Sequence, residues 1–510
     1  MTRRPRRLAA RLPLVIALVA TGVVGGIAAA PPSVALPGTV VEPVAVASER
    51  LLAGRPGEGL RLRGNRILAR RDTSSAPTVV CAPIWFTAVG VTWDQQAGTP
   101  LELEIATGAR RGDFGASRTL DAESGADPAT EEYVRGDAAS SLLWTGGSRC
   151  VRVTMRLPEG TSISALELQF INSSGSAAGP GTAPPYVDPS VIPIADPGAF
   201  APAAASALAA QPKLISRQQW GARPSLMNCT PDVADEVRAG FVHHTAGTNR
   251  YTRKQADDIV RSIYAYHTRG RGWCDIAYNF LIDRFGRAYE GRSGGITEPV
   301  VGAAQQGFNT RAFSVSLMGT FTRKRPSSSM MRSLRKLLAW RLDVAHLNPR
   351  GRGVLTSAGG DNTRYDAGDH VSVPVITAHR TTGYTDCPGR KVVRRLKDVR
   401  RTVSRMGLPK IYKPRVEPSV VKAGSPPLRI RAVGSRSLEW SVSVHEAGGA
   451  QLFAFPPRTG SELDLVWEGS DATPYPRSSG TYELVVRGEN ADGEIARAAT
   501  LPFKIKPSAL

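Results

Sequence analysis

The sequence predicts an α/β domain with an all-β domain on either side of it. Between residues 212 and 407, apolar runs typical of buried strands alternate with segments whose apolar residues recur at helical spacing. Residues 42–172 and 411–507 instead show short runs of alternating β-branched and polar residues, separated by turn residues. A chain of 510 residues is long enough for two to four domains, each with its own core.

The chain is strongly basic. It carries 65 Lys and Arg residues against 44 Asp and Glu, which gives a net charge of +21 at pH 7. Long-range attraction therefore favours anionic partners. Nucleic acid and an anionic cell-wall polymer are the two classes that this charge suggests.

The first residues predict export. Five arginines precede an uncharged run, 12–41, which contains small-residue motifs at 28–30 and 33–35. This is the pattern of a secretory signal peptide, placed at 1–35, and it predicts a secreted, cell-wall-associated protein with no nucleic acid partner. The apolar stretch is long for a signal peptide, so an uncleaved membrane anchor is the alternative. A twin-arginine signal is weakly indicated, because Pro5 interrupts the arginines.

The first all-β region, 42–172, shows no cluster of catalytic residues. Its carboxylates Asp94 and Glu102 are isolated in the sequence and are expected on a solvated surface. A wall-binding or scaffold role is open for this region. The stretch that follows, 173–211, is rich in Ala, Pro, Gly and Ser with almost no charge, which is typical of a semi-rigid linker.

Local signals place several elements of the α/β region. Thr252 and Gln255 form a capping box that starts a helix with one apolar face. His267 falls on that face and is interpreted as a core or boundary residue. The segment 283–287 predicts a hairpin turn, which puts Tyr278 at the start of the preceding strand. Two histidines have no partner at ligand spacing and are interpreted as ordinary surface or boundary residues: His346 and His370.

Three side chains of the α/β region suit a single metal ion: His243, His379 and Cys387. Catalytic zinc takes three protein ligands of nitrogen, sulfur or oxygen type and leaves the fourth tetrahedral position to water or substrate. His243 ends an apolar run that predicts a strand, whereas the other two lie eight positions apart in a segment rich in Gly, Thr and Pro. A strand end and a loop can converge on one ion, although the spacing alone is also compatible with chance.

Three motifs closely resemble the peptidoglycan recognition protein and type-2 N-acetylmuramoyl-L-alanine amidase family. They are FVHHTA at 241–246, WCDIAYNF at 273–280, and the segment 378–389, which opens with AHR and closes with DCPG. The resemblance covers about 214–406, and it is specific because separate motifs agree in order and spacing with the zinc-dependent members. It implies a central mixed β-sheet flanked by helices and a zinc amidase or peptidoglycan recognition domain at 212–407.

The resemblance also implies roles for individual residues. It makes His243, His379 and Cys387 the zinc ligands and Tyr278 the catalytic tyrosine, and it puts Thr385 where some members place a Lys. Residues 302–309 depart from the family pattern, because several members carry a His near Ala304. Substrate contacts of that segment are therefore not carried over, whereas the metal ligands are.

Five cysteines in an exported chain leave one without a disulfide partner. With Cys387 assigned to the metal, the other four permit three pairings. The expected pairings keep each bridge within one domain: Cys81 with Cys150, and Cys229 with Cys274.

A basic helix and a second all-β region follow the metal loop. Apolar residues recur at helical spacing over 392–403, with Arg and Lys between them. We interpret this segment as a domain helix with a solvated charged face in preference to a dedicated anion site. Residues 411–507 predict a small β-sandwich that weakly resembles the immunoglobulin-like modules of exported bacterial proteins, with a role in adhesion, spacing or partner contact.

Three classes of function compete for this sequence. The resemblance implies a secreted zinc amidase that cleaves the amide bond between N-acetylmuramic acid and L-alanine, with Zn²⁺ as cofactor and peptidoglycan muramyl peptides as partner. A non-catalytic peptidoglycan-binding protein is disfavoured because such members typically lack a full ligand set. A zinc endopeptidase acting on the stem peptide is disfavoured because the chain has no His-Glu-x-x-His motif. No general base is identifiable, because strand pairing or capping explains the nearby acidic residues equally well: Asp275, Glu290 and Asp386.

Overall fold

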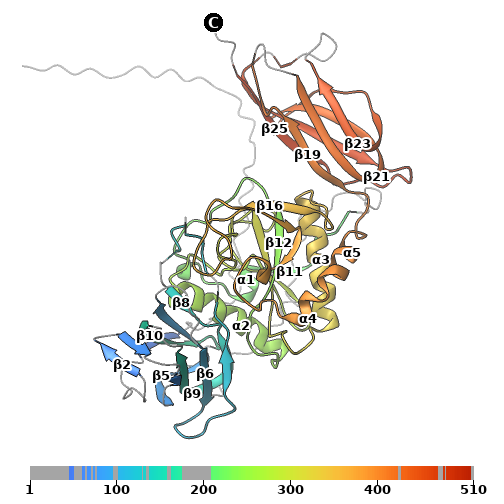
Figure 1. Ribbon diagram of the computed structural model, residues 1–510. Coiled ribbons are helices and arrows are strands. Elements are labelled where there is room, and N and C mark those ends of the chain that lie inside the picture. The colour runs from blue at the N-terminus through green and yellow to red at the C-terminus, as the bar shows by residue number, and fades with distance from the viewer. Residues whose placement is uncertain are drawn as a thin grey trace, which may run out of the picture. The chain divides into compact units, whose positions relative to one another are not determined.

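A computed structural model describes most of the chain after residue 44 (Figure 1). The described ranges are 45–50, 60–63, 66–69, 73–74, 77–95, 102–123, 125–128, 130–133, 137–157, 162–174, 208–422, 427–468, 475–476 and 478–506. The predicted signal peptide, the alternative membrane anchor and most of the predicted linker lie outside these ranges. Within them, no helix is long and apolar enough to cross a membrane.

The first region is an antiparallel β-domain, as its alternating sequence predicts. Its strands are β1 (Ala45–Arg50), β2 (Leu60–Arg63), β3 (Arg66–Ala69), β4 (Thr73–Ser74), β5 (Thr78–Gln95), β6 (Glu102–Gly108), β7 (Arg118–Leu120), β8 (Asp137–Ala139), β9 (Leu143–Leu157) and β10 (Ser162–Asn172). They join in one sheet with the main order β2-β3-β10-β5-β9-β6-β7. Cys81 and Cys150 stand opposite each other on β5 and β9 and form the expected disulfide.

The central region alternates strands and helices, which confirms the α/β prediction. Its strands are β11 (Leu214–Ile215), β12 (Ala239–His244), β13 (Phe280–Ile282), β14 (Ala288–Glu290), β15 (Ala312–Leu317), β16 (Arg352–Thr356), β17 (His370–Pro374) and β18 (Ile376–Ala378). Its helices are α1 (Arg217–Trp220), η1 (Pro224–Leu226), α2 (Arg253–Ala265), η2 (Tyr266–Gly270), α3 (Ser328–Val344), η3 (His379–Thr381), α4 (Arg390–Val393) and α5 (Leu396–Val403).

Six of these strands form a mixed sheet in the order β11-β14-β13-β15-β12-β18. All neighbours are parallel except the hairpin of β13 and β14. Helices pack on both faces, because successive side chains of a strand point to opposite sides. Leu281 joins the core that contains α2, whereas Phe280 and Ile282 join the core that contains α3 and α5. Figure 1 shows these helices around the sheet.

Two sequence-based boundaries in this region were wrong. The strand that follows Tyr278 begins at Phe280, so Tyr278 lies in the loop before it. The basic helix is not continuous but divides into α4 and α5 around Arg394 and Arg395. The capping box at Thr252 is confirmed, since Thr252 caps α2 with both reciprocal hydrogen bonds.

The last region is all-β, as predicted. Its strands are β19 (Ile411–Glu417), β20 (Val420–Val421), β21 (Leu428–Glu446), β22 (Gln451–Ala454), β23 (Arg458–Trp467), β24 (Gly480–Glu489) and β25 (Ala499–Ile505). The long β21 pairs with β19, β22, β23 and β24, and the strands enclose a core that includes Trp440, Trp467 and Phe503. The immunoglobulin-like character of this region stays a prediction, as do the predicted domain boundaries.

Candidate metal centre

His243 and His379 meet because their strands are parallel neighbours. His243 is the fifth residue of β12, and His379 directly follows β18. Val242 and Ala378 stand opposite each other in this pairing. The residues that follow them, His243 and His379, therefore lie side by side at the same end of the sheet. The two imidazole rings lie 4.6 Å apart between centroids, and both side chains are buried.

Cys387 reaches the same point from a tight loop after η3. The Arg380 amide donates to the Cys387 carbonyl at 2.9 Å, and Thr385 Oγ1 accepts from the Cys387 amide at 3.1 Å. Gly389, at φ 87°, closes the loop where a Cβ would lie 2.4 Å from the Phe321 backbone, so the position favours glycine. The loop leaves Cys387 Sγ buried, 3.6 Å from His243 Nδ1.

Gln305 fixes which nitrogen of His243 faces the cysteine. Its Oε1 lies 3.0 Å from His243 Nε2, and both side chains are almost fully buried. An amide oxygen can only accept, so Nε2 carries the proton and Nδ1 keeps its lone pair toward Cys387. Metal-binding histidines typically donate their other N–H to such an acceptor. The sequence did not single out Gln305, which lies in the segment that departs from the family pattern.

The donor set fits a zinc ion. His243, His379 and Cys387 offer ligand atoms that all lie within 4.8 Å of one another. Two ligands of a tetrahedral zinc, with bonds of about 2.3 Å to sulfur and about 2.0–2.1 Å to nitrogen, lie about 3.6 Å apart, which equals the Sγ–Nδ1 distance. His379 Nε2 is buried and has no hydrogen-bond partner among the described residues, as expected of a nitrogen kept for a metal.

Burial also holds the histidines in the form that binds metal. It lowers the pKa of His379 to about 3 and that of His243 well below the usual range, so both are neutral at pH 7. Burial raises the pKa of the Cys387 thiol, whereas a coordinating cation deprotonates a thiol outright. In the part of the chain that the structure describes, the other group of potential ligands combines Glu132 with Cys229 and Cys274, whose sulfurs are already bonded to each other.

Comparison with known proteins places this region in a family. The family model for N-acetylmuramoyl-L-alanine amidase matches residues 234–390. Peptidoglycan recognition protein 1 of Bos taurus is 35% identical over 136 residues, which cover 27% of this chain and 69% of that protein. Peptidoglycan-recognition protein SC2 of Drosophila melanogaster is 28% identical over 179 residues, covering 35% of this chain and 82% of that protein.

The chain belongs to the peptidoglycan recognition protein and type-2 amidase family. Among solved structures, Drosophila PGRP-LB matches with 22% identity and a TM-score of 0.29, over 36% of this chain and 92% of that chain. The family match includes the three candidate ligands, Tyr278 and Thr385, whereas the two β-regions lie outside it.

Tyr278 and Thr385 both line the cavity beside the candidate ligands of this family member. The Tyr278 ring lies 5.7 Å from the His243 ring. Burial, and then the nearby charges of Glu123 and Cys387, raises the pKa of Tyr278 well above its usual value, so its hydroxyl stays protonated. Thr385 Oγ1 accepts a hydrogen bond from the Cys387 amide, which leaves the Thr385 hydroxyl proton to donate elsewhere.

The acidic residues that the sequence placed near the site are engaged elsewhere. Asp275 is fully buried and pairs with Arg217 at 3.1 Å, Glu290 accepts from the Arg217 amide at 3.2 Å, and Asp386 pairs with Arg380 at 3.5 Å. The carboxylates that do line the cavity, Asp121 and Glu123, come from the N-terminal β-domain. No sequence signal pointed to them, because nothing local distinguishes them from other surface acids.

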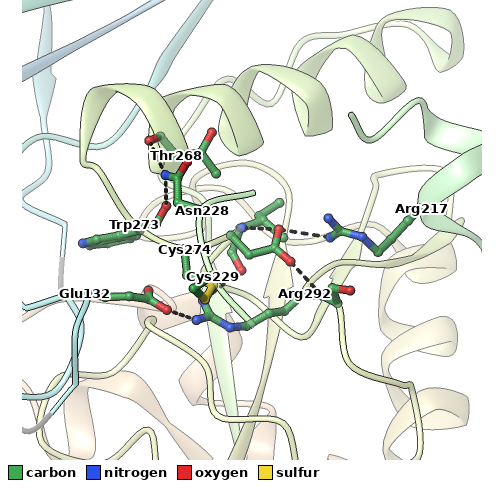
Figure 2. Close-up of a disulfide and its surroundings, with 11 residues drawn as sticks. Glu132, Arg217, Asn228, Cys229, Thr268, Trp273, Cys274 and Arg292 are labelled. Atoms are coloured by element: carbon green, nitrogen blue, oxygen red, sulfur yellow. Dashed lines mark hydrogen bonds and ion pairs between the residues drawn. A yellow bond between two sulfur atoms is a disulfide. The ribbon is translucent and has the colours of Figure 1, made fainter. Parts of the chain in front are cut away.

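The disulfide of the family domain is the one expected. Cys229 and Cys274 join the segment before β12 to the loop that carries Tyr278 (Figure 2). Asn228 supports the bridge, since its amide donates to the Cys274 carbonyl at 3.1 Å and its Nδ2 to the Trp273 carbonyl at 3.2 Å. The bridge therefore ties the loop that carries Tyr278 to the segment before β12.

Proposed function

We propose that this protein is a secreted, zinc-dependent N-acetylmuramoyl-L-alanine amidase that hydrolyses the amide bond between N-acetylmuramic acid and L-alanine in peptidoglycan. The observation that carries this proposal is the set of two neutral histidines and one thiol whose ligand atoms lie within 4.8 Å of one another, with His379 Nε2 lacking a hydrogen-bond partner among the described residues. Three protein ligands leave one coordination position open, as in catalytic zinc sites. The amidase family model and the peptidoglycan-recognition relatives support the substrate class.

In this proposal, His243, His379 and Cys387 hold the ion and Gln305 orients His243. Zinc bound there supplies a Lewis acid for the amide carbonyl and lowers the pKa of a coordinated water toward about 7. Tyr278 donates a hydrogen bond to the oxygen on which negative charge develops, because its raised pKa keeps the hydroxyl protonated. Thr385 is the second donor at the cavity wall.

Product analysis tests the proposed reaction. We expect prolonged digestion of peptidoglycan by the zinc-loaded protein to release stem peptides with a free L-alanine amino group, detected by mass spectrometry. Removal of zinc with a chelator should stop the release and zinc addition should restore it, because the site has an exchangeable open position. Products cut within the stem peptide would favour the endopeptidase instead, and absence of bound zinc would contradict the proposal.

Gln305 should control zinc affinity through His243. We expect Gln305→Leu to weaken zinc binding about 10- to 100-fold, because it removes the acceptor that fixes the His243 tautomer. Gln305→Glu is the matched control, since it keeps an acceptor oxygen and should retain more affinity than the Leu variant. Competition with a chromophoric chelator measures both constants, and equal affinities in the two variants would contradict this role.

A further inference from the structure

The N-terminal β-domain contributes a segment that lies over the candidate metal centre. Residues 121–136 connect β7 to β8, and the structure describes 121–123, 125–128 and 130–133 of them. Asp121, Ala122 and Glu123 of this segment line the same cavity as His243, His379 and Cys387. The N-terminal β-domain and the family domain therefore both contribute residues to the lining of this cavity.

The cavity that remains is small. Its volume is about 30 Å³, and about 10–15 Å³ suffice for one water. It can hold an ion and very few waters, whereas sites for drug-sized ligands are roughly 300–1,000 Å³. The cavity itself is therefore too small for a sugar with a peptide attached.

Three acidic side chains fasten the segment, each to a different part of the family domain. Glu123 Oε1 accepts from His267 Nε2 at 3.1 Å, because the Ala277 amide occupies His267 Nδ1. Glu132 pairs with Arg292 beside the Cys229–Cys274 disulfide, as Figure 2 shows.

The third contact lies deepest. Asp127 is 1% exposed and accepts from the amides of Gly307 and Asn309, at 2.6 and 3.1 Å, and from Asn309 Nδ2 at 2.7 Å. Gly307 and Asn309 belong to the same loop as Gln305, so the contact borders the metal ligand His243.

The body of the β-domain supports the same closed arrangement. Tyr266 of η2 donates to the carbonyls of Val91 and Ser140 at 3.2 and 2.9 Å. Gly90 permits this approach, because a Cβ there would lie 2.5 Å from the Tyr266 ring. Burial raises the pKa of Asp127 to about 6. The carboxylate is therefore charged at neutral pH, although burial disfavours the charged form. A contact of this kind can open, since water solvates a released carboxylate well.

We propose that the described parts of this segment, 121–123, 125–128 and 130–133, are a built-in cover that closes the metal centre against muramyl peptides and must move away before they can bind. The expected effect of the cover on hydrolysis rests on the proposed amidase function, whereas the contacts that hold the cover over the site do not. The cover is acidic and its anchors are N–H donors, so loss of one acidic side chain shifts the equilibrium toward the open form.

The test weakens single anchors in the full-length protein and measures two quantities. Asp127→Asn keeps the shape but puts an NH₂ group against backbone donors, and Glu132→Gln removes the charge that faces Arg292. Glu131→Gln changes the exposed neighbour of Glu132 and is the matched control.

The first quantity is the rate at which iodoacetamide alkylates Cys387 in metal-free protein. This rate reports on the site alone, because the other four cysteines are in disulfides.

We expect alkylation to accelerate at least tenfold in Asp127→Asn and Glu132→Gln and to stay at the wild-type rate in Glu131→Gln. The second quantity, stem-peptide release by the zinc-loaded proteins, should rise in the same two variants. Faster alkylation without hydrolysis in any protein would support the cover and refute the amidase. Unchanged alkylation would overturn the cover, and so would faster alkylation with slower hydrolysis, because the segment would then be part of the substrate site.

Discussion

Cys387→Ser should abolish stem-peptide release while the protein still folds and binds peptidoglycan. The thiolate is the anionic ligand of the proposed zinc site, and a neutral hydroxyl replaces it poorly. The loss of zinc affinity should exceed the roughly 10–100-fold that follows loss of an outer-shell partner. The fold should survive, because the two side chains are nearly the same size and the domain's hydrophobic cores do not include Cys387.

Zinc content, wall binding and product release should be measured on the same preparations. Because the proposed cover restricts access to the site, the substitution should be made in wild type and in Asp127→Asn. His370→Ala is the control, since His370 is exposed and outside the cavity, and it should keep zinc and rate. If Cys387→Ser matches its parent in binding and neither parent releases stem peptide, the protein is a binder and not an amidase.

Tyr278→Phe should lower kcat about 10²–10³-fold while zinc content is unchanged. The substitution removes a hydroxyl that lines the cavity but leaves all three candidate ligands in place. Loss of one oxyanion donor costs about 2.7–4 kcal/mol of transition-state stabilisation where it has been measured. KM should change little, because the hydrogen bond forms as charge develops on the substrate oxygen.

Tyr264→Phe makes the same chemical change away from the site and serves as the control. Tyr264 is buried on α2, and its hydroxyl donates to the Arg223 carbonyl at 2.8 Å. Its loss should reduce stability by about 1 kcal/mol without changing kcat. Equal kcat values for Tyr278→Phe and the parent enzyme would remove Tyr278 from the mechanism.

Local signals in the sequence determined the fold class and the main elements. The period of apolar residues predicted α2, and a capping box placed its start at the correct residue. The same period could not show that the basic helix breaks between α4 and α5, because Val392, Leu396, Val399 and Val403 keep helical spacing across the break. Short motifs sufficed for the candidate ligands, whose roles remain predictions.

Only the tertiary structure decided what surrounds those ligands. Gln305 lies 62 residues from His243, and Asp127 lies 180 residues from Gly307. Neither residue belongs to a periodic pattern or a motif, so the sequence shows each as an ordinary polar side chain. Chain topology selects its partner, because parallel pairing of β12 and β18 and packing of the β-domain on η2 bring distant segments to one cavity. Whether a carboxylate faces water or a buried amide depends on that packing, which local sequence does not encode.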